Sequence, residues 1–290
     1  MPAELFGERY QFLPRAEILS FEEIERVVRV LVRNGVNKVR LTGGEPLVRR
    51  DLDRLVAQLM ALDGLQTLSM TTNGFHLAEH ARLLREAGLD AVTVSIDTLE
   101  PTKFRELVRR DALDRVLAGI EAALREGFRP IKLNVVPMRG VNEEAVEEFA
   151  RLARSGPYIV RFIEYMPLDS GRAWSTDKVV PAEEMLERLA ALSPLELIRD
   201  QDPHQPSRRY RFTDGKGEIG IIASVTRPFC DRCDRIRLTA DGKILNCLFS
   251  HDEYDLRSVL RNGGSDEDLL ATMAHAVGQK KEGHVVNQPS

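Results

Sequence analysis

Apolar and polar residues follow a repeating order through the first half of the chain, in which a stretch with helical periodicity leads through a glycine into a short apolar run. In the first unit, Ser20 and Glu23 form a capping box, apolar residues recur at helical spacing, and Gly35 ends the helix. Residues 38–42 then have the composition of a strand. The pattern predicts alternating helices and strands.

The same unit returns along the chain up to residue 165. A helix that we expect Asp51 to cap leads through Gly64 to the next apolar run. The remaining predicted strands share this position after a helix, and they cover residues 65–71, 91–96, 131–136 and 159–165. Because helices separate the strands, we expect parallel pairing with right-handed crossovers.

Beyond Pro181 the pattern changes to short strands joined by turns. The predicted strands cover residues 195–198, 209–213, 219–224, 235–239 and 243–247, and two helices follow at 256–261 and 266–277. Turns such as Asp214-Gly215 and Asp241-Gly242 indicate hairpins. We therefore place a domain boundary near residue 180, between a parallel barrel portion over residues 1–180 and a smaller α+β region over residues 181–290.

Composition narrows the class of protein. Of the 290 residues, 43% are apolar and 30% are charged, which excludes disorder over the whole length. No apolar run approaches the roughly 20 residues of a membrane span, and the first residues lack the pattern of a secretory signal, so we expect a cytoplasmic protein. The net charge of −4 gives no overall attraction to nucleic acid.

The cysteines are the first candidate site. Cys230, Cys233 and Cys247 form the pattern C-x2-C-x13-C, which can bring two thiolates to a metal centre from one turn and a third from the following hairpin. One interpretation is structural zinc with His251 as a fourth ligand. The other is a [4Fe-4S] cluster in which one iron has no cysteine and is open to a substrate atom. Unrelated structural cysteines are the least favoured interpretation at this spacing.

The ends of the predicted strands form a second set of candidates. Residues 43–46 (GGEP) follow the first strand, Asn73-Gly74 the second, Asp97 the third and Met166-Pro167 the fifth. In barrels of this kind the carboxyl ends of the strands hold the active site. Each motif alone could be an ordinary turn, whereas their repetition at strand ends favours a site.

Cations inside the predicted strands are the third candidate. Lys38 and Arg40 share a face, as do Lys132 and Asn134, and Arg161 lies within an apolar run. A parallel barrel normally fills its interior with branched apolar side chains, and an unpaired buried cation is costly. These positions therefore need partners.

Two explanations account for these cations. They could pair with acids such as Glu164 or Asp97. Alternatively, they could hold a polyanion in the mouth of the barrel. Residues 208–237 contain eight Lys or Arg against four Asp or Glu, so a phosphate-bearing ligand would meet cations from both regions.

Five motifs together resemble one enzyme family. They are LTGGEPL at 41–47, TNG at 72–74, SID at 95–97, RFIEYMP at 161–167 and CDRCDRIR at 230–237. On these motifs the chain resembles the GTP 3',8-cyclase family (molybdenum cofactor biosynthesis protein A) of radical S-adenosylmethionine (SAM) enzymes. The resemblance covers almost the whole chain, and the last motif is specific to this family among radical SAM proteins.

The resemblance implies an α/β fold, a partial (β/α)6 TIM-like barrel lacking its first strand, with a C-terminal α+β extension that binds iron–sulfur and GTP. It implies the radical SAM cyclisation of GTP to 3',8-cyclo-7,8-dihydro-GTP, a carbon–carbon lyase reaction and the first step of molybdopterin (molybdenum cofactor) biosynthesis. In the family, an N-terminal [4Fe-4S] cluster cleaves SAM reductively, and the 5'-deoxyadenosyl radical takes a hydrogen from C3' of GTP.

Carried over position by position, the resemblance assigns binding residues. Those that would contact SAM are Gly43, Gly44, Glu45, Ser95 and Met166. Those that would contact GTP are Lys38, Arg40, Thr71, Lys132, Arg161, Arg235, Ile236 and Arg237. Cys230, Cys233 and Cys247 would bind a second [4Fe-4S] cluster, whose open iron meets the guanine base. The implied partners are an electron donor such as flavodoxin, a second copy in a homodimer and cyclic pyranopterin monophosphate synthase in functional coupling, with no nucleic acid and no membrane.

The chain departs from the family pattern in two places. The C-x3-C-x2-C motif that holds the SAM cluster is not among the 290 residues, and the chain ends at Ser290 without the family's Gly-Gly tail. We therefore expect a piece of the family's full-length protein, in which the N-terminal SAM cluster would also be present. We expect these residues alone to be inactive and assign no catalytic residue. The alternatives are a non-catalytic zinc- or nucleotide-binding paralogue and another radical SAM enzyme with an auxiliary cluster, such as a peptide-maturing one; the arginines after Cys233 disfavour the latter.

Overall fold

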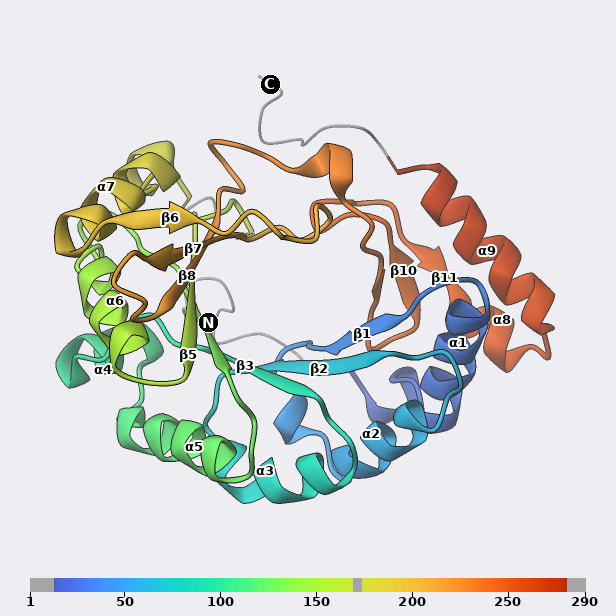
Figure 1. The fold of residues 1–290 in the computed structure, drawn as a ribbon. Coiled ribbons are helices and arrows are strands. Elements are labelled where there is room, and N and C mark those ends of the chain that lie inside the picture. The colour runs from blue at the N-terminus through green and yellow to red at the C-terminus, as the bar shows by residue number, and fades with distance from the viewer. Residues whose placement is uncertain (1–12, 169–173, 281–290) are drawn as a thin grey trace.

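The computed structural model describes residues 13–168 and 174–280 and shows a curved α/β sheet wrapped by helices (Figure 1). The sheet has eight strands in the order β1-β2-β3-β4-β5-β8-β7-β6. Its first five strands are parallel: β1 (Lys38–Leu41), β2 (Thr67–Thr72), β3 (Ala91–Ser95), β4 (Ile131–Val135) and β5 (Tyr158–Ile163). These are the five strands that the periodicity predicts.

The last three strands of the sheet come from the C-terminal half of the chain. They are β6 (Leu195–Leu197), β7 (Arg208–Phe212) and β8 (Glu218–Ile222). β6, β7 and β8 form the antiparallel run that the turn signals indicate. β8 also pairs with β5 in parallel, with Arg161 opposite Gly220. The sheet therefore continues across residue 180, and the domain boundary there stays a prediction.

Helices cover the convex side of the sheet (Figure 1). Along the chain they are α1 (Phe21–Arg33), α2 (Leu52–Met60), α3 (Leu77–Glu86), α4 (Pro101–Val108), α5 (Leu113–Arg125), α6 (Ala145–Ser155) and α7 (Ala182–Leu192). The capping box of Ser20 and Glu23 begins α1, as predicted. Asp51 stands at the N-cap position of α2, as expected, but it adopts a left-handed conformation with φ of 58° and its side chain makes no capping hydrogen bond.

The two faces of the parallel strands differ in chemistry. The side chains that pack toward the helices are apolar and fully buried, and they are Leu68, Met70, Val92, Val94, Leu133, Val135, Val160 and Phe162. The alternate positions, such as Arg40, Thr93 and Lys132, lie on the concave face, since successive side chains of a strand point to opposite faces. The apolar core thus lies between sheet and helices, and the concave face is polar.

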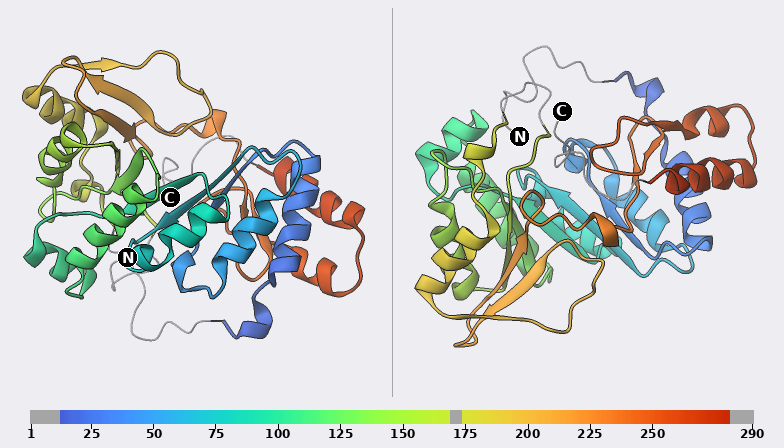
Figure 2. Two further views of the ribbon diagram at one scale, coloured as in Figure 1. Left: turned by 60° about the horizontal axis from the view of Figure 1, so that its bottom comes forward. Right: turned by 90° about the horizontal axis from the view of Figure 1, so that it is seen from above.

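A second, smaller unit completes the described chain. It consists of β9 (Arg237–Leu238), β10 (Lys243–Leu245), β11 (Tyr254–Asp255), α8 (Leu256–Arg261) and α9 (Asp266–Gly278). Its apolar side packs on α1, where Val27 and Val30 meet Ile244, Leu256 and Met273. Figure 2 shows α8 and α9 beside α1. The C-terminal unit is therefore packed against the first helix of the chain.

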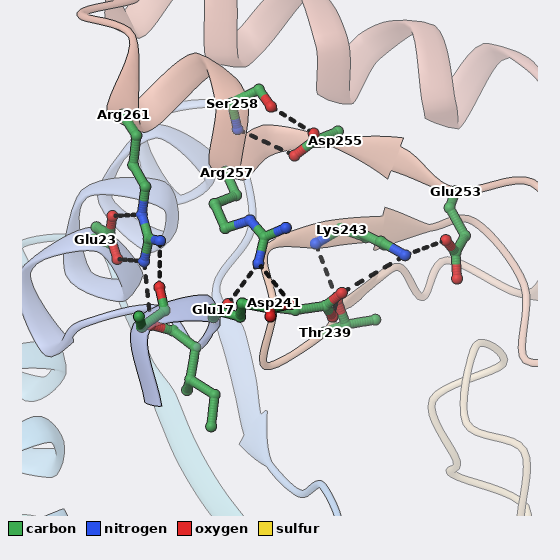
Figure 3. Close-up of polar contacts among 12 residues, drawn as sticks. Glu17, Glu23, Thr239, Asp241, Lys243, Glu253, Asp255, Arg257, Ser258 and Arg261 are labelled. Carbon is green, nitrogen blue, oxygen red and sulfur yellow. Dashed lines mark hydrogen bonds and ion pairs between the residues drawn. The ribbon is translucent and has the colours of Figure 1, made fainter. Parts of the chain in front are cut away.

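Polar contacts continue this junction (Figure 3). Arg261 donates to both carboxylate oxygens of Glu23, at 2.8 and 3.1 Å, and Arg257 donates to the backbone oxygen of Glu17 at 2.8 Å. Gly242 makes close approach possible, because a Cβ at this position would lie 2.9 Å from the Leu19 side chain. Over residues 13–168 and 174–280, no helix is long and apolar enough to span a membrane.

Candidate functional site

Two arginines meet at the centre of the concave face. Arg40 of β1 donates from Nη1 to the hydroxyl oxygens of Thr71 and Thr93, at 3.3 and 3.2 Å. Arg161 of β5 donates from Nη2 to the same Thr93 oxygen at 3.1 Å. Thr93 is 1% exposed, so its hydroxyl is a fixed acceptor. Strands that are far apart in the sequence thus bring three of the predicted GTP contacts together: Arg40, Thr71 and Arg161.

These cations have no acidic partner in the described part of the chain. No carboxylate there lies within salt-bridge distance of Arg40, Lys132 or Arg161. The pairing with Glu164 or Asp97 that the sequence left open is not found, since both carboxylates bind other groups. A concave surface of unneutralised positive charge remains.

Burial and mutual repulsion lower the pKa values of these cations. Burial, together with the charge of Arg40, lowers the pKa of Arg161 to about 10. Burial also lowers the pKa of Lys132, and the nearby charges of Arg161 and Arg40 add to this effect. Since the charged forms are disfavoured in the absence of an anion, a bound anion would relieve the repulsion.

The other predicted strand cation has a different environment. Lys38 is exposed and pairs with Asp202, whose Oδ2 lies 3.2 Å from the lysine Nζ. His204 donates its backbone N–H to Oδ1 of Asp202 at 3.0 Å. The Nδ1 atom of His204 lies 3.1 Å from the backbone oxygen of Arg232. The loop of Asp202 and His204 therefore contacts both the barrel strand β1 and the turn that carries the first two cysteines.

The space around Arg161 depends on a glycine that the sequence analysis did not single out. A Cβ at Gly220 would lie 3.0 Å from Cγ of Arg161 and 2.2 Å from Oγ of Ser207. Three buried polar atoms near this register have no hydrogen-bond partner among the described residues: Nε of Arg161, Oδ1 of Asn134 and Oγ of Ser207. Only the parallel pairing of β5 with β8 brings Gly220 opposite Arg161.

The GGEP loop at the end of β1 combines open backbone with a fixed carboxylate. Gly43 and Gly44 are exposed, and Gly43 has a φ of 137°, which favours glycine. The Glu45 carboxylate accepts from Thr72 Oγ1 and from the backbone N–H of Asn73, each at 2.7 Å. Glu45 thus joins the carboxyl ends of β1 and β2 while the two glycines leave their backbone accessible.

The other predicted SAM contacts lie at the same end of the sheet. Ser95 is the exposed last residue of β3, and Met166 is partly exposed three residues after β5. Asp97 accepts from the N–H of Val136 at 2.8 Å and so ties the ends of β3 and β4 together. Burial raises the pKa of Asp97. These residues line the carboxyl edge, where parallel barrels place their active sites.

The cysteines sit in a positively charged environment at the C-terminal unit. Arg235 donates from Nη2 to Cys233 Sγ at 3.2 Å, and Lys280 donates from Nζ to the same sulfur at 3.5 Å. Lys280 also donates to the backbone oxygen of Arg235 at 2.9 Å. Sequence reasoning missed Lys280, because 47 positions separate it from Cys233.

The three thiols influence one another. Burial, followed by the charges of Cys247 and Cys233, raises the pKa of Cys230. Burial also acts to raise the pKa of Cys233, but hydrogen bonds from Arg235 and the charges of Arg235 and Lys280 outweigh it and lower the pKa overall. Arg237 belongs to the same group, since burial and the charge of Arg235 lower its pKa. Ile236 is the third predicted GTP contact of this stretch. It lies between Arg235 and Arg237 in the sequence, and it is partly buried.

The two metal centres that the sequence left open, a zinc ion and a [4Fe-4S] cluster, need different ligand geometries. Within the described ranges, no three His, Cys, Asp or Glu side chains converge on one ion position, with or without His251. Zinc needs all its ligands at one ion, whereas each iron of a [4Fe-4S] cluster takes its own thiolate. The three thiols, with two cations at the Cys233 sulfur, are the residues that would hold such a cluster.

Comparison with known sequences identifies relatives over most of the chain. Residues 6–153 match the Radical SAM superfamily, and residues 158–286 match the family Molybdenum Cofactor Synthesis C. The GTP 3',8-cyclase of Acidothermus cellulolyticus is 49% identical over 96% of this chain and 77% of its own length. That of Moorella thermoacetica is 44% identical over 92% of this chain and 83% of its own. The human protein named molybdenum cofactor biosynthesis protein 1 is 43% identical over 93% of this chain and 42% of its own length.

Comparison with solved structures shows the same fold. Streptococcus suis SuiB bound to S-adenosylmethionine aligns with a TM-score of 0.63 at 15% identity, covering 87% of this chain and 60% of that one. The native enzyme anSMEcpe with bound AdoMet aligns with a TM-score of 0.56 at 13% identity, covering 96% of this chain and 75% of that one. The fold is thus that of a partial TIM-like radical SAM barrel.

Proposed function

The chain belongs to the GTP 3',8-cyclase family of radical SAM enzymes, and we propose that its concave face binds GTP for the radical cyclisation that begins molybdenum cofactor biosynthesis. The observation that carries this proposal is the unneutralised group of Arg40, Lys132 and Arg161. A triphosphate supplies the negative charge that these side chains lack within the described chain. Charge-assisted hydrogen bonds of this kind are short and strong.

The GTP site in this proposal extends from the barrel to the C-terminal unit. Lys38, Arg40, Thr71, Lys132 and Arg161 would hold the nucleotide from the strands, and Arg235, Ile236 and Arg237 would hold it from the cysteine segment. The contacts of Asp202 with Lys38 and of His204 with the Arg232 backbone support this arrangement, because they tie the two groups together.

The cofactors have separate places in the proposal. Cys230, Cys233 and Cys247 would bind a [4Fe-4S] cluster, which, when bound, supplies an iron open to a guanine atom. Arg235 and Lys280 stabilise the thiolate form of Cys233. SAM would bind at the carboxyl edge, with Gly43 and Gly44 offering backbone groups, Ser95 a hydroxyl and Met166 an apolar contact. Glu45 holds the loop of these glycines in place.

Further parts of the proposal rest on the family resemblance. They are an electron donor such as flavodoxin, a homodimer, functional coupling to cyclic pyranopterin monophosphate synthase and a cytoplasmic location. The expectation that these 290 residues do not cleave SAM by themselves stays a prediction.

Nucleotide binding tests the proposal. We expect the protein to bind GTP at least tenfold more tightly than guanosine, and we expect the GTP affinity to fall as salt rises from 50 to 300 mM. The variant Arg40→Ala should weaken GTP binding by about 1.5 to 3 kcal/mol. Arg154→Ala is the matched control, because Arg154 pairs with Asp214 through its Nη2, 2.7 Å from Oδ2, and is not among the concave-face cations. Equal affinity for GTP and guanosine would contradict a phosphate-binding face.

A further inference from the structure

Glu164 is a fully buried carboxylate that takes no part in the proposed binding sites. It follows β5 directly, and its side chain is 0% exposed. Its oxygens accept from the N–H groups of Ala182, Val225 and Thr226, at 2.8, 2.7 and 2.8 Å, and from the Thr226 hydroxyl. Buried charge is tolerated where every oxygen is hydrogen-bonded in this way.

The donors come from two segments, and Glu164 lies in a third. Glu164 itself lies two residues before Met166, Ala182 begins α7, and Val225 and Thr226 lie in the loop after β8. That loop reaches Cys230 four residues after Thr226. The backbone of Glu164 also binds the end of β8 and the loop after it. Its N–H donates to the Ile222 oxygen at 3.1 Å, and its backbone oxygen accepts from Ser224 Oγ at 3.3 Å.

The carboxylate is the one side chain of this size that can satisfy these donors. Four donors converge on two oxygens, so both oxygens must act as acceptors. A glutamine has nearly the same shape, but its NH2 group would face a backbone N–H and leave it without an acceptor. Position 164 therefore requires a side chain with two acceptor oxygens, and a side chain of the same size alone is not enough.

We propose that Glu164 is a positioning residue that holds the Met166 segment and the loop leading to Cys230 in one fixed relation. The inference rests on the proposed function, since it assigns these two segments to SAM and to the second cluster. Glu164 would act through the backbone of both segments and would touch neither ligand.

Hydrogen exchange and cluster retention test this role. In the cluster-loaded protein, Glu164→Gln should raise amide exchange at least tenfold both in residues 224–230 and in residues 165–168, and a chelator should remove iron at least five times faster. Thr226→Val should raise exchange and iron loss by a smaller factor, because it removes only the hydroxyl donor, and Thr226→Ser should restore the wild-type values. Asp90→Asn is the control: Asp90 accepts from Leu68 N–H at 2.7 Å and should affect only that region.

The outcomes separate this inference from the proposed function. Unchanged exchange and unchanged iron release in Glu164→Gln would overturn the positioning role, as would faster exchange in one segment alone. If Glu164→Gln fails to fold, the Thr226→Val and Thr226→Ser pair decides the matter by the same readouts. Failure of wild-type protein to bind GTP would refute the proposed function and would leave the exchange result valid.

Discussion

Arg40 and Arg161 donate to the same hydroxyl oxygen, that of Thr93, at 3.2 and 3.1 Å. Two guanidinium groups on non-adjacent strands thus share one neutral acceptor, with no carboxylate of the described chain between them. Like charges held this close repel each other, and burial adds to the cost. The rest of the fold must offset this cost, and the proposed anion would relieve the repulsion.

The first prediction is that Arg161→Met stabilises the ligand-free protein and weakens GTP binding. Removing a partly buried, unpaired cation should raise the free energy of unfolding by about 1 kcal/mol. Loss of a charge-assisted contact should weaken GTP binding by about 1.5 to 3 kcal/mol. Urea denaturation and calorimetric titration measure the two effects. Arg154→Met should show the reverse, with lower stability and unchanged affinity, because Arg154 is paired with Asp214.

The second prediction concerns pH. Arg161, with a pKa of about 10, carries its charge at neutral pH. If GTP binds the charged form of Arg161, its affinity should stay constant between pH 7 and 8.5 and should fall as the pH rises through 10, where Arg161 loses its proton. In Arg161→Met this fall should be smaller. An affinity that increases on going from pH 8.5 to 10.5 would contradict the assignment.

The third prediction concerns the metal. Protein reconstituted anaerobically should contain about four irons and four sulfides per chain, as a single [4Fe-4S] cluster requires. Cys233→Ala should lose them, because it removes one of the three proposed ligands, whereas His251→Ala should retain them, because a cluster held by the three cysteines does not need His251. Stoichiometric zinc without sulfide, lost in His251→Ala, would establish the zinc interpretation instead.

The fourth prediction compares two helix starts. Ser20→Ala should lower the free energy of unfolding by about 1 kcal/mol, because Ser20 caps α1. Asp51→Gly should raise it by about 0.5 to 1 kcal/mol, since Asp51 makes no cap and glycine adopts a φ of 58° without strain. Thermal and urea unfolding check both. A loss of stability in Asp51→Gly as large as that in Ser20→Ala would mean that Asp51 caps α2 after all.

The candidate site was predictable where it depends on short motifs. The GGEP loop, the strand cations and the three cysteines stand out because each combines unusual residue types within a few positions. The partners of these residues were not predictable. Glu164 is adjacent in sequence to the strand of Arg161, and yet its oxygens bind Ala182 and the Val225–Thr226 segment. Lys280 contacts Cys233 only because α9 returns to the cysteine turn.

The sequence by itself determined the alternation of helices and strands, the cap of α1 and the cations and cysteines of the candidate site. These follow from local periodicity and side-chain chemistry, which act within one or two turns of chain. Tertiary structure alone decided that β8 joins β5 in parallel, that Gly220 leaves room for Arg161, that Lys38 pairs with Asp202, and that Arg40 and Arg161 share Thr93 with no carboxylate partner among the described residues. Such relations depend on which distant segments share hydrogen bonds and buried surface, and no local pattern encodes that choice.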